Sequence, residues 1–300
     1  IKEYVQKYPH IIKPIYETQN QYSKIGSPYY IDKMMWSKVR GKYVALCEGD
    51  DYWISADKLQ KQVDFLEAHP DFSMCVHPVY EIFADDPSRK RIIPPPETRI
   101  KKDVLTIDDF VFDYNDMCYT ASIMFRWRKD ALDLLPFGII TGDMWLCTLH
   151  ASVGKVKFID EVMAVYTISP TGISQRYFGE GADSEFGLRN VVEMMRFYDS
   201  VYRDIMHKDE KYYRDLTYHF YFICKQLLAP ENKKYENNLL KLHQEFSEYF
   251  HNMIRDLHDA FSNRDYEARK FRKKFKLFRL LFVGMTVLFI CLLITFLKAI

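Results

Sequence analysis

The sequence lacks three features that would place it in common functional classes. It carries 42 Lys and Arg against 41 Asp and Glu, a formal net charge of +1, so it has no basic excess to favour nucleic acid as the main partner. Its six cysteines form no Cys-x-x-Cys pair, which excludes the usual zinc-ligand spacing and favours free thiols in a reducing compartment. No internal repeat or low-complexity tract occurs in the chain.

The chain also lacks an initiating methionine, and no signal peptide precedes its first apolar segment. Residues 1–9 have the pattern of the end of a helix that is already under way, and we therefore expect the true N-terminus to lie upstream. The 300 residues are 48% hydrophobic, which is enough for a sizeable core with appendages.

Short apolar runs alternate with helical patterns in the first 180 residues. The runs predict strands at residues 11–16, 42–47, 72–83 and 121–127, and one or two more within 156–168. Helical spacing predicts helices at residues 29–40, 58–68, 106–112 and 143–152, with a loop at 85–102. In the helix at 58–68 we expect Leu59, Val63 and Leu66 to form the buried face. This alternation indicates a mixed α/β fold in layers.

The pattern changes near residue 181, where strand signals end. Long helical patterns at 186–201, 212–228 and 238–261 predict a helical appendage over residues 181–268. A basic segment at 269–279 then precedes residues 280–297, which are 18 residues without a charge. This length and composition predict a transmembrane helix, with a buried core helix as the alternative. By the positive-inside rule, the basic flank and the α/β domain lie on the cytoplasmic side of the cell membrane, which the chain crosses once.

The most informative stretch is the acidic turn Glu-Gly-Asp-Asp-Tyr-Trp at 48–53, which directly follows a predicted strand. Ligands bind outside the carboxyl ends of strands in open α/β sheets. Clustered carboxylates there suit a hard divalent cation such as Mg²⁺ or Mn²⁺. The alternative is a solvated acidic turn, as expected for the Asp pairs at 85–86 and 108–109, neither of which follows an apolar strand.

Residues 41–53, together with Lys-Leu-Gln-Lys-Gln at 58–62, resemble the acidic metal-site signature of family 2 glycosyltransferases. The resemblance covers about residues 1–175. It implies an inverting enzyme of the bacterial polysaccharide-biosynthesis type, with a GT-A nucleotide-diphospho-sugar transferase fold over residues 1–180. The family's first strands, which bind the nucleoside, would lie upstream of Ile1.

The same resemblance implies roles for residues of the acidic turn. Asp51 would ligate the Mn²⁺ or Mg²⁺ ion, and Asp50 would bind the ribose or complete the metal shell. Glu48 would support them, and Trp53 would line the donor site, where it could stack on a sugar or simply pack in the core.

A second carboxylate, Asp143, opens the predicted helix at 143–152. The resemblance implies that Asp143 is the general base, since the family places its base at the start of a helix beneath the acceptor. Gly142 stands where the family often has Glu. The alternative is that Asp143 only caps the helix.

Three further residues are candidates for the acceptor side. Thr120 and Ser122 lie in a stretch that resembles the family strand leading to the acceptor, although such hydroxyls often bond to nearby backbone. Trp145 could stack on a sugar or pack in the core. Thr167 stands in a loop where related sequences often carry residues that bind the pyrophosphate.

The leading hypothesis is therefore a hexosyltransferase-type glycosyltransferase that moves a sugar from a nucleotide-diphosphate donor to a saccharide or lipid-linked acceptor. One alternative is another diphosphate-handling transferase, such as a nucleotidyltransferase, which would need a glycine- and lysine-rich phosphate loop. The other alternative is a non-catalytic adaptor anchored to the membrane.

Overall fold

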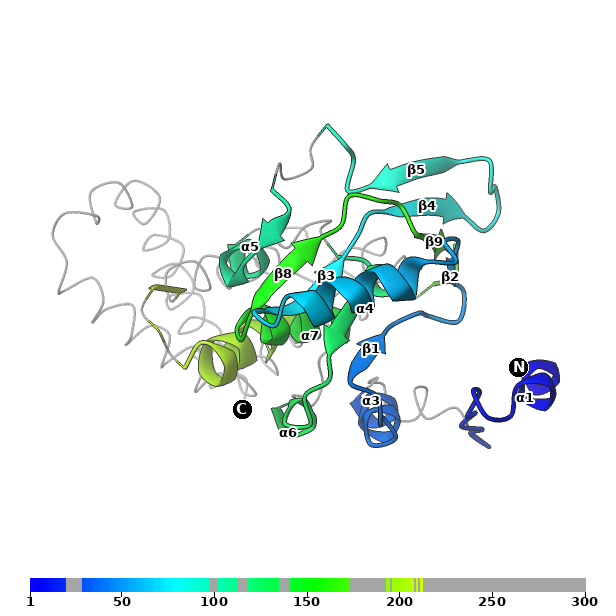
Figure 1. Ribbon diagram of the computed structural model, residues 1–300, viewed down its shortest axis with the longest axis horizontal. Helices are drawn as coiled ribbons and strands as arrows, with labels where there is room; N and C mark the ends of the chain where they lie inside the picture. Colours follow the sequence, from blue (N-terminus) through cyan, green and yellow to red (C-terminus); the bar gives the residue numbers. More distant parts are fainter. Residues whose placement is uncertain are drawn as a thin grey trace, which may run out of the picture. The chain divides into compact units, whose positions relative to one another are not determined.

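The structure, a computed structural model, describes residues 1–19, 29–97, 102–112, 118–134, 141–172, 193–194, 196–207, 209 and 211–212. Within these ranges the chain forms a five-stranded sheet in the order β1-β7-β3-β8-β6 and a four-stranded sheet in the order β2-β9-β4-β5 (Figure 1). The predicted mixed α/β fold is confirmed. No helix in the described residues is both long and apolar enough to span a membrane, and the predicted helix at 280–297 lies outside those residues.

The bounds of the elements are as follows. The five-stranded sheet consists of β1 (Tyr43–Ala45), β7 (Met124–Arg126), β3 (Phe72–Val76), β8 (Lys155–Phe158) and β6 (Val104–Leu105). The four-stranded sheet consists of β2 (Tyr52–Trp53), β9 (Ala164–Ile168), β4 (Val79–Phe83) and β5 (Lys90–Ile93). The α-helices are α1 (Lys2–Lys7), α3 (Tyr29–Trp36), α4 (Lys58–Ala68), α5 (Ile107–Phe112), α6 (Ala131–Leu134) and α7 (Gly142–Ala151). Two shorter turns are the 3₁₀ turn η1 (Thr120–Ser122) and the π-helical turn η2 (Val201–Ile205).

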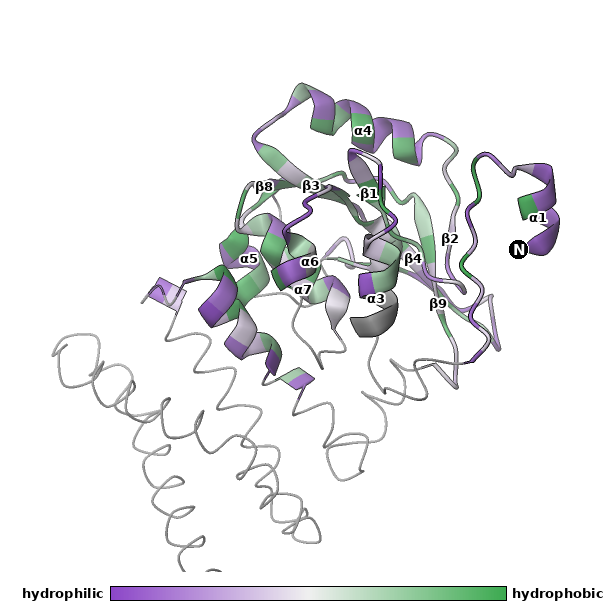
Figure 2. Ribbon diagram, turned by 90° about the horizontal axis from the view of Figure 1, so that it is seen from below, coloured by the Kyte–Doolittle hydropathy of each residue, from purple (hydrophilic) through white to green (hydrophobic). Residues whose placement is uncertain are grey.

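The five-stranded sheet has helices on both faces, with α4 on one face and α5 and α7 on the other (Figure 2). Side chains of β3 alternate between the two faces from Met74 to Val76, and a register irregularity between Phe72 and Met74 sets Phe72 on the same face as Cys75. Phe72 and Cys75 pack in a cluster with Leu66 of α4. Met74 and Val76 pack in the larger cluster with α7. Every residue of β3 is buried, and β3 is therefore the centre of the core.

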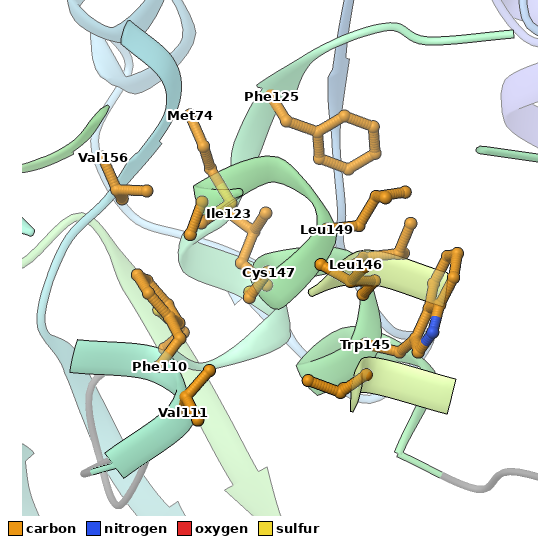
Figure 3. Packing of buried hydrophobic residues seen from close by; sticks show 14 of the residues in the cluster. Met74, Phe110, Val111, Ile123, Phe125, Trp145, Leu146, Cys147, Leu149 and Val156 are labelled. Atoms are coloured by element: carbon orange, nitrogen blue, oxygen red, sulfur yellow. The ribbon is translucent and has the colours of Figure 1, made fainter. Parts of the chain in front are cut away.

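The larger core cluster surrounds α7. Trp145, Leu146, Cys147 and Leu149 of this helix meet Met74, Phe110, Val111, Ile123, Phe125 and Val156 (Figure 3). Full burial of such a side chain contributes roughly 1.5–3 kcal/mol, so this contact stabilises the position of α7 strongly. Val201 and Ile205 of η2 belong to the same cluster; they are described residues of the predicted helical appendage, most of which lies outside the described ranges.

The predicted single strand at 72–83 is wrong, because the chain changes sheets within it. β3 pairs in parallel with β8 in one sheet, and β4 pairs in parallel with β9 in the other. The two strands are separated by His77 and Pro78. Proline has no N–H to donate to a ladder, so regular pairing cannot continue through Pro78.

Three other local predictions need correction. Residues 11–16 form no strand and leave Ile11 and Ile15 exposed. The predicted loop at 85–102 contains β5, which pairs antiparallel with β4 and sets Arg91 opposite the buried Glu81. The predicted strand at 121–127 begins instead with the turn η1, and only β7 pairs in the sheet. The polar residues of β5 gave no strand pattern, because the strand is defined by its pairing with β4 and not by its own apolar residues.

The predicted helix at 58–68 matches α4, and its predicted buried face is right in part. Leu66 is buried and Val63 packs partly buried against the same cluster, but Leu59 is 40% exposed, and Lys58 and Gln62 are buried instead. The helix ends before Pro70, because a residue that precedes proline disfavours helical backbone. The helix predicted at 29–40 ends earlier, at Trp36.

Candidate active site at the carboxyl end of β1

The acidic turn begins just beyond β1 and closes on itself. The Asp51 N–H donates to the Glu48 carbonyl oxygen at 3.2 Å. Asp50 is exposed at the tip of this turn, and Asp51 is 9% exposed. The turn leads directly into β2, so its residues lie between the two sheets in the chain. The sequence prediction of a polar turn after a strand is confirmed.

Asp51 uses only one of its two carboxylate oxygens within the described residues. Oδ1 accepts a hydrogen bond from the Thr167 N–H at 2.9 Å, whereas Oδ2 is buried without a partner. Burial raises the pKa of Asp51 to about 6, and the Thr167 N–H partly offsets this rise. A buried oxygen without a partner costs stability unless a ligand satisfies it. Asp51 Oδ2 is therefore a buried acceptor whose hydrogen-bonding capacity is unused in the described part of the chain.

Glu48 and Asp143 meet at a shared hydroxyl, that of Thr120. Thr120 Oγ1 lies 3.4 Å from Glu48 Oε1 and 3.3 Å from Asp143 Oδ2. The three residues come from the acidic turn, η1 and the first turn of α7. A hydroxyl has one proton, so Thr120 donates to one carboxylate at a time. The structure thus brings together two carboxylates that lie 95 positions apart in the sequence.

Both carboxyl groups of this pair, Glu48 and Asp143, have pKa values above the ordinary range. Although Glu48 is accessible to solvent, surrounding protein atoms raise the pKa of its carboxyl to about 7, with smaller contributions from Asp143, Asp51 and Asp50. Burial also raises the pKa of Asp143, while hydrogen bonds from the Met144 N–H and the Thr120 hydroxyl lower it. A carboxyl with a raised pKa is a stronger base than an ordinary one.

The helix α7 begins at Gly142, with Thr141 at its N-cap, so Asp143 lies inside the first turn rather than at the N-cap position. Its Oδ1 accepts the Met144 N–H at 2.8 Å, one of the N–H groups that have no partner within the helix. Asp143 thus stabilises the start of α7, and the hydrogen bond leaves its Oδ2 directed at Thr120. The positive end of the helix dipole also favours a carboxylate here.

Two predicted acceptor-side residues do not reach this site. Ser122 is fully buried and donates to the Tyr119 carbonyl oxygen at 2.7 Å. Trp145 is fully buried, and its Nε1–H donates to Ser200 Oγ at 3.2 Å. Residues two apart share a face in a strand, but they point about 120° apart in a 3₁₀ turn and about 160° apart in an α-helix. When Thr120 and Asp143 face the site, Ser122 and Trp145 therefore point in other directions.

Trp53 remains at the surface, with 36% of its area exposed, and its Nε1–H donates to the Ala121 carbonyl oxygen at 3.1 Å. Sequence reasoning missed Lys58 and Gln62, which are buried behind this ring. Their spacing of four residues, which places two long polar side chains on one face of the helix, was the available signal. The contact from Thr167 left no signal, because it is made by the backbone.

The described residues contain no group of three or more His, Cys, Asp or Glu side chains arranged to hold a metal ion. The oxygen donors nearest to such a role are the unpaired Oδ2 of Asp51 and the exposed carboxylate of Asp50. Both are hard ligands that suit Mg²⁺ or Mn²⁺. They fit an ion that takes most of its ligands from a bound diphosphate.

The chain is similar in sequence to proteins whose names state no activity. No protein-family model matches the chain. The uncharacterized protein Mb1547 of Mycobacterium bovis and the uncharacterized protein Rv1520 of Mycobacterium tuberculosis are each 35% identical to it over 175 residues. These matches cover 58% of this chain and 46% of each relative, so the chain spans about half the length of the curated relatives it matches.

One solved structure is similar over a larger share of the chain. It is the crystal structure of S. aureus TarS 1–349, with a TM-score of 0.40 and 15% sequence identity. The similarity covers 67% of this chain and 58% of that chain.

Proposed function

We propose that the chain carries the metal and base side of the active site of an inverting glycosyltransferase with a GT-A fold. The observation that carries the proposal is the meeting of Glu48 and Asp143 at the Thr120 hydroxyl, beside a turn in which Asp51 Oδ2 is buried without a partner among the described residues. The sequence resemblance to family 2 glycosyltransferases named these positions independently of the structure. Donor and acceptor would meet at the carboxyl end of β1, where ligands bind in α/β sheets.

Asp143 would accept the proton of the attacking sugar hydroxyl. Such a hydroxyl is a weak nucleophile, and a positioned base lowers the barrier as the new bond forms. Burial raises the pKa of Asp143, which makes this carboxylate a better proton acceptor than an exposed aspartate. One direct displacement at the anomeric carbon inverts its configuration.

Asp51 and Asp50 would hold a divalent cation together with the donor diphosphate. When bound, the cation offsets the negative charge that develops on the leaving diphosphate. The Thr167 N–H holds Asp51 Oδ1, and Oδ2 is the carboxylate oxygen that has no partner within the described ranges. A cation there would also lower the pKa of Asp51 from about 6 and keep its carboxyl ionised at neutral pH.

The proposal also places the acceptor at the membrane surface. Residues 280–297, which are outside the described ranges, would anchor the chain and place the site at the cytoplasmic face, beside saccharide or lipid-linked acceptors. Removal of the residues after Phe275 should leave donor turnover and impair transfer to a lipid acceptor. Recovery of the intact protein in the soluble fraction without detergent would rule out the anchor.

The deciding experiment is a screen of nucleotide-sugar donors with the full-length protein, in which release of nucleoside diphosphate is measured with and without Mn²⁺. We expect release with one donor class, loss of release in excess chelator, and recovery on addition of Mn²⁺. Asp85→Asn is the control, since Asp85 is an exposed residue in a loop distant in sequence from the site. Release that is insensitive to chelator would exclude the metal role.

A further inference from the structure

The inner face of α4 carries a buried polar pair close behind the site. Lys58 and Gln62 are both 0% exposed, and the Lys58 Nζ donates to Gln62 Oε1 at 2.8 Å. The same Nζ lies 4.6 Å from the centroid of the Trp53 ring. Burial lowers the pKa of Lys58 to about 8, so the ammonium remains mostly charged at neutral pH. An amide oxygen and an indole ring are thus the contacts of a buried cation.

Gln62 and Trp53 both donate to the turn η1. The Gln62 Nε2–H donates to the Ser122 carbonyl oxygen at 2.9 Å, and the Trp53 Nε1–H donates to the Ala121 carbonyl oxygen at 3.1 Å. Two consecutive carbonyl groups are therefore held from two different elements. Lys58 contacts both donors, so it joins them into one unit.

Lys58 also determines which way the Gln62 amide faces. In the opposite orientation, the amide NH₂ would face the ammonium group, and its oxygen would face the Ser122 carbonyl oxygen. Both contacts would then be repulsive, since an ammonium group only donates and a carbonyl oxygen only accepts. The buried lysine therefore keeps the donor of Gln62 directed at η1.

The first residue of this turn is Thr120, whose two contacts are sensitive to small movements. Its hydroxyl is 3.4 Å from Glu48 and 3.3 Å from Asp143, near the upper limit for a hydrogen bond. A shift of a few tenths of an ångström would break either contact. Ala121 packs with Val79, Ile93 and Ala164, but apolar packing is non-directional and does not set the rotation of the turn.

We propose that Gln62, oriented by Lys58, is a positioning residue that holds Thr120 between Glu48 and Asp143. The effect of Gln62 on sugar transfer rests on the proposed function, because that function makes Asp143 the base. The contact by which Gln62 holds the turn η1 does not depend on the proposed function, so the contact and the effect on transfer can be tested separately.

The test variant is Gln62→Glu in the full chain, which keeps the side-chain shape and the partner for Lys58 but replaces the donor with an oxygen. Hydrogen–deuterium exchange of the peptide over residues 119–123 should become about tenfold faster, as expected for a lost buried hydrogen bond. That peptide contains the turn's own bonds, from the Ser122 N–H to the Tyr119 carbonyl oxygen and from the Ile123 N–H to the Thr120 carbonyl oxygen. Gln60→Glu, on the exposed face of the same helix, should leave the exchange unchanged.

Activity supplies the second measurement. In Gln62→Glu, kcat should fall while KM for the donor changes little, and the acid limb of the kcat profile should move to higher pH. The direction follows from Thr120, whose hydrogen bond lowers the pKa of Asp143. Thr120→Val should reproduce the shift of the acid limb, and Thr120→Ser, which keeps the hydroxyl, should restore the wild-type limb.

The outcomes separate the two proposals. Faster exchange in Gln62→Glu, with no donor turnover by the wild-type protein, supports the hold on the turn and contradicts the proposed function. An active wild-type protein with unchanged exchange and an unchanged acid limb in Gln62→Glu overturns the inference. If Gln62→Glu does not fold, the double variant Lys58→Met/Gln62→Met takes its place, since it removes the donor to Ser122 without leaving Lys58 as a buried charge that lacks its partner, and the same exchange result is required.

Discussion

The carboxyl groups of the candidate site have raised pKa values, whereas those of the outer surface have lowered ones. Burial raises the pKa of Glu48, Asp51 and Asp143, and no lysine or arginine is among the groups that offset the rise. Glu67, Asp71, Asp103 and Asp108 each have a lowered pKa, with a hydrogen bond from a lysine as its first cause.

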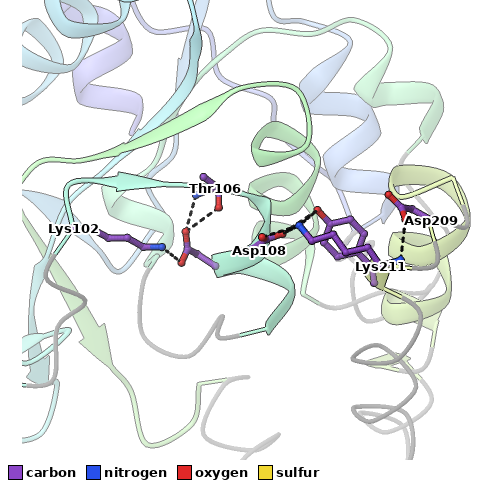
Figure 4. A network of polar contacts seen from close by, with 7 residues as sticks. Lys102, Thr106, Asp108, Asp209 and Lys211 are labelled. Atoms are coloured by element: carbon purple, nitrogen blue, oxygen red, sulfur yellow. Dashed lines mark hydrogen bonds and ion pairs between the residues drawn. The ribbon is translucent and has the colours of Figure 1, made fainter. Parts of the chain in front are cut away.

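The network around α5 shows the second arrangement. Lys211 and the Tyr212 hydroxyl contact Asp108, while Thr106 and Lys102 contact Asp109 (Figure 4). Here every acid has a cation or donor from the protein itself. At the candidate site no such cation is among the groups that act on Glu48, Asp51 and Asp143, and the proposed metal–diphosphate complex would supply the missing positive charge.

The largest expected effect separates catalysis from surface charge. Asp143→Asn should lower kcat by at least about 10²-fold, the lower range for a general base, with little change in donor affinity. Release of nucleoside diphosphate at saturating donor measures it. Asp108→Asn is the matched control and should retain full kcat; a variant at Asp143 that loses donor binding but keeps kcat would give Asp143 another role.

Asp51→Asn should abolish activity while raising the stability of the fold. The amide oxygen can still accept the Thr167 N–H, but the charge that would hold the cation is lost, so transfer should be abolished at any Mn²⁺ concentration. At pH 8 the variant should be more stable than the wild type by on the order of 1 kcal/mol, because an ionised buried carboxyl has been removed. Chemical denaturation measures this difference, and a loss of stability would contradict the raised pKa of Asp51.

The pH dependence of stability should distinguish the carboxyl groups of the candidate site from the lysine-paired carboxyl groups of the surface. With pKa values of about 7 for Glu48 and about 6 for Asp51, against ordinary values of 4.5 and 3.8, the folded chain holds more protons than the unfolded chain. Their contribution to the free energy of unfolding therefore falls as pH rises from about 4 to about 7. For the lysine-paired surface acids, the contribution is instead lost as pH falls below the ordinary value.

The measurement is the difference between the double variant Glu48→Gln/Asp51→Asn and the wild type across this range. A difference is needed because the buried His77 and His150, whose pKa values fall to about 4 and about 3, act in the opposite direction below pH 6.5. The variant should gain stability relative to the wild type between pH 4 and pH 7. A constant difference across the range would contradict the raised pKa values.

The smallest effect is expected at the surface. Asp108→Asn should lower stability by about 0–1 kcal/mol, the usual range for an exposed ion pair, and the loss should shrink in high salt. Thermal denaturation at two salt concentrations measures it. A loss several times larger would mean that Lys211 and Tyr212 are held to α5 more tightly than an exposed pair allows.

The sequence predicted the features that depend on local pattern. The bounds of α4, the strand β1 and the acidic turn follow from apolar spacing and from glycine and proline positions. It could not show that His77 and Pro78 divide one apolar run between two sheets, because the division depends on partner strands some 80 residues away. Likewise, β5 carries Lys90 and Arg91 and has no apolar pattern of its own.

Within the site, the residue types were predictable, but their directions were not. Thr120 and Ser122 share a face only if the stretch is a strand, and the 3₁₀ turn η1 sends them apart. The inner face of α4 could not be predicted from hydrophobicity, since Lys58 and Gln62 lie where Leu59 was expected. Such exceptions to apolar burial are where functional or positioning roles are best sought.

The division of residues 72–83 between two sheets also bears on how the chain acquires its structure during synthesis. Both parallel pairs join this segment to residues 155–168, so neither can form until the ribosome has released the later segment. Until then β3 and β4 expose unpaired edges, and contacts between distant residues form slowly. A nascent chain that stalls before residue 155 would therefore keep one edge of each strand open to pairing with another chain.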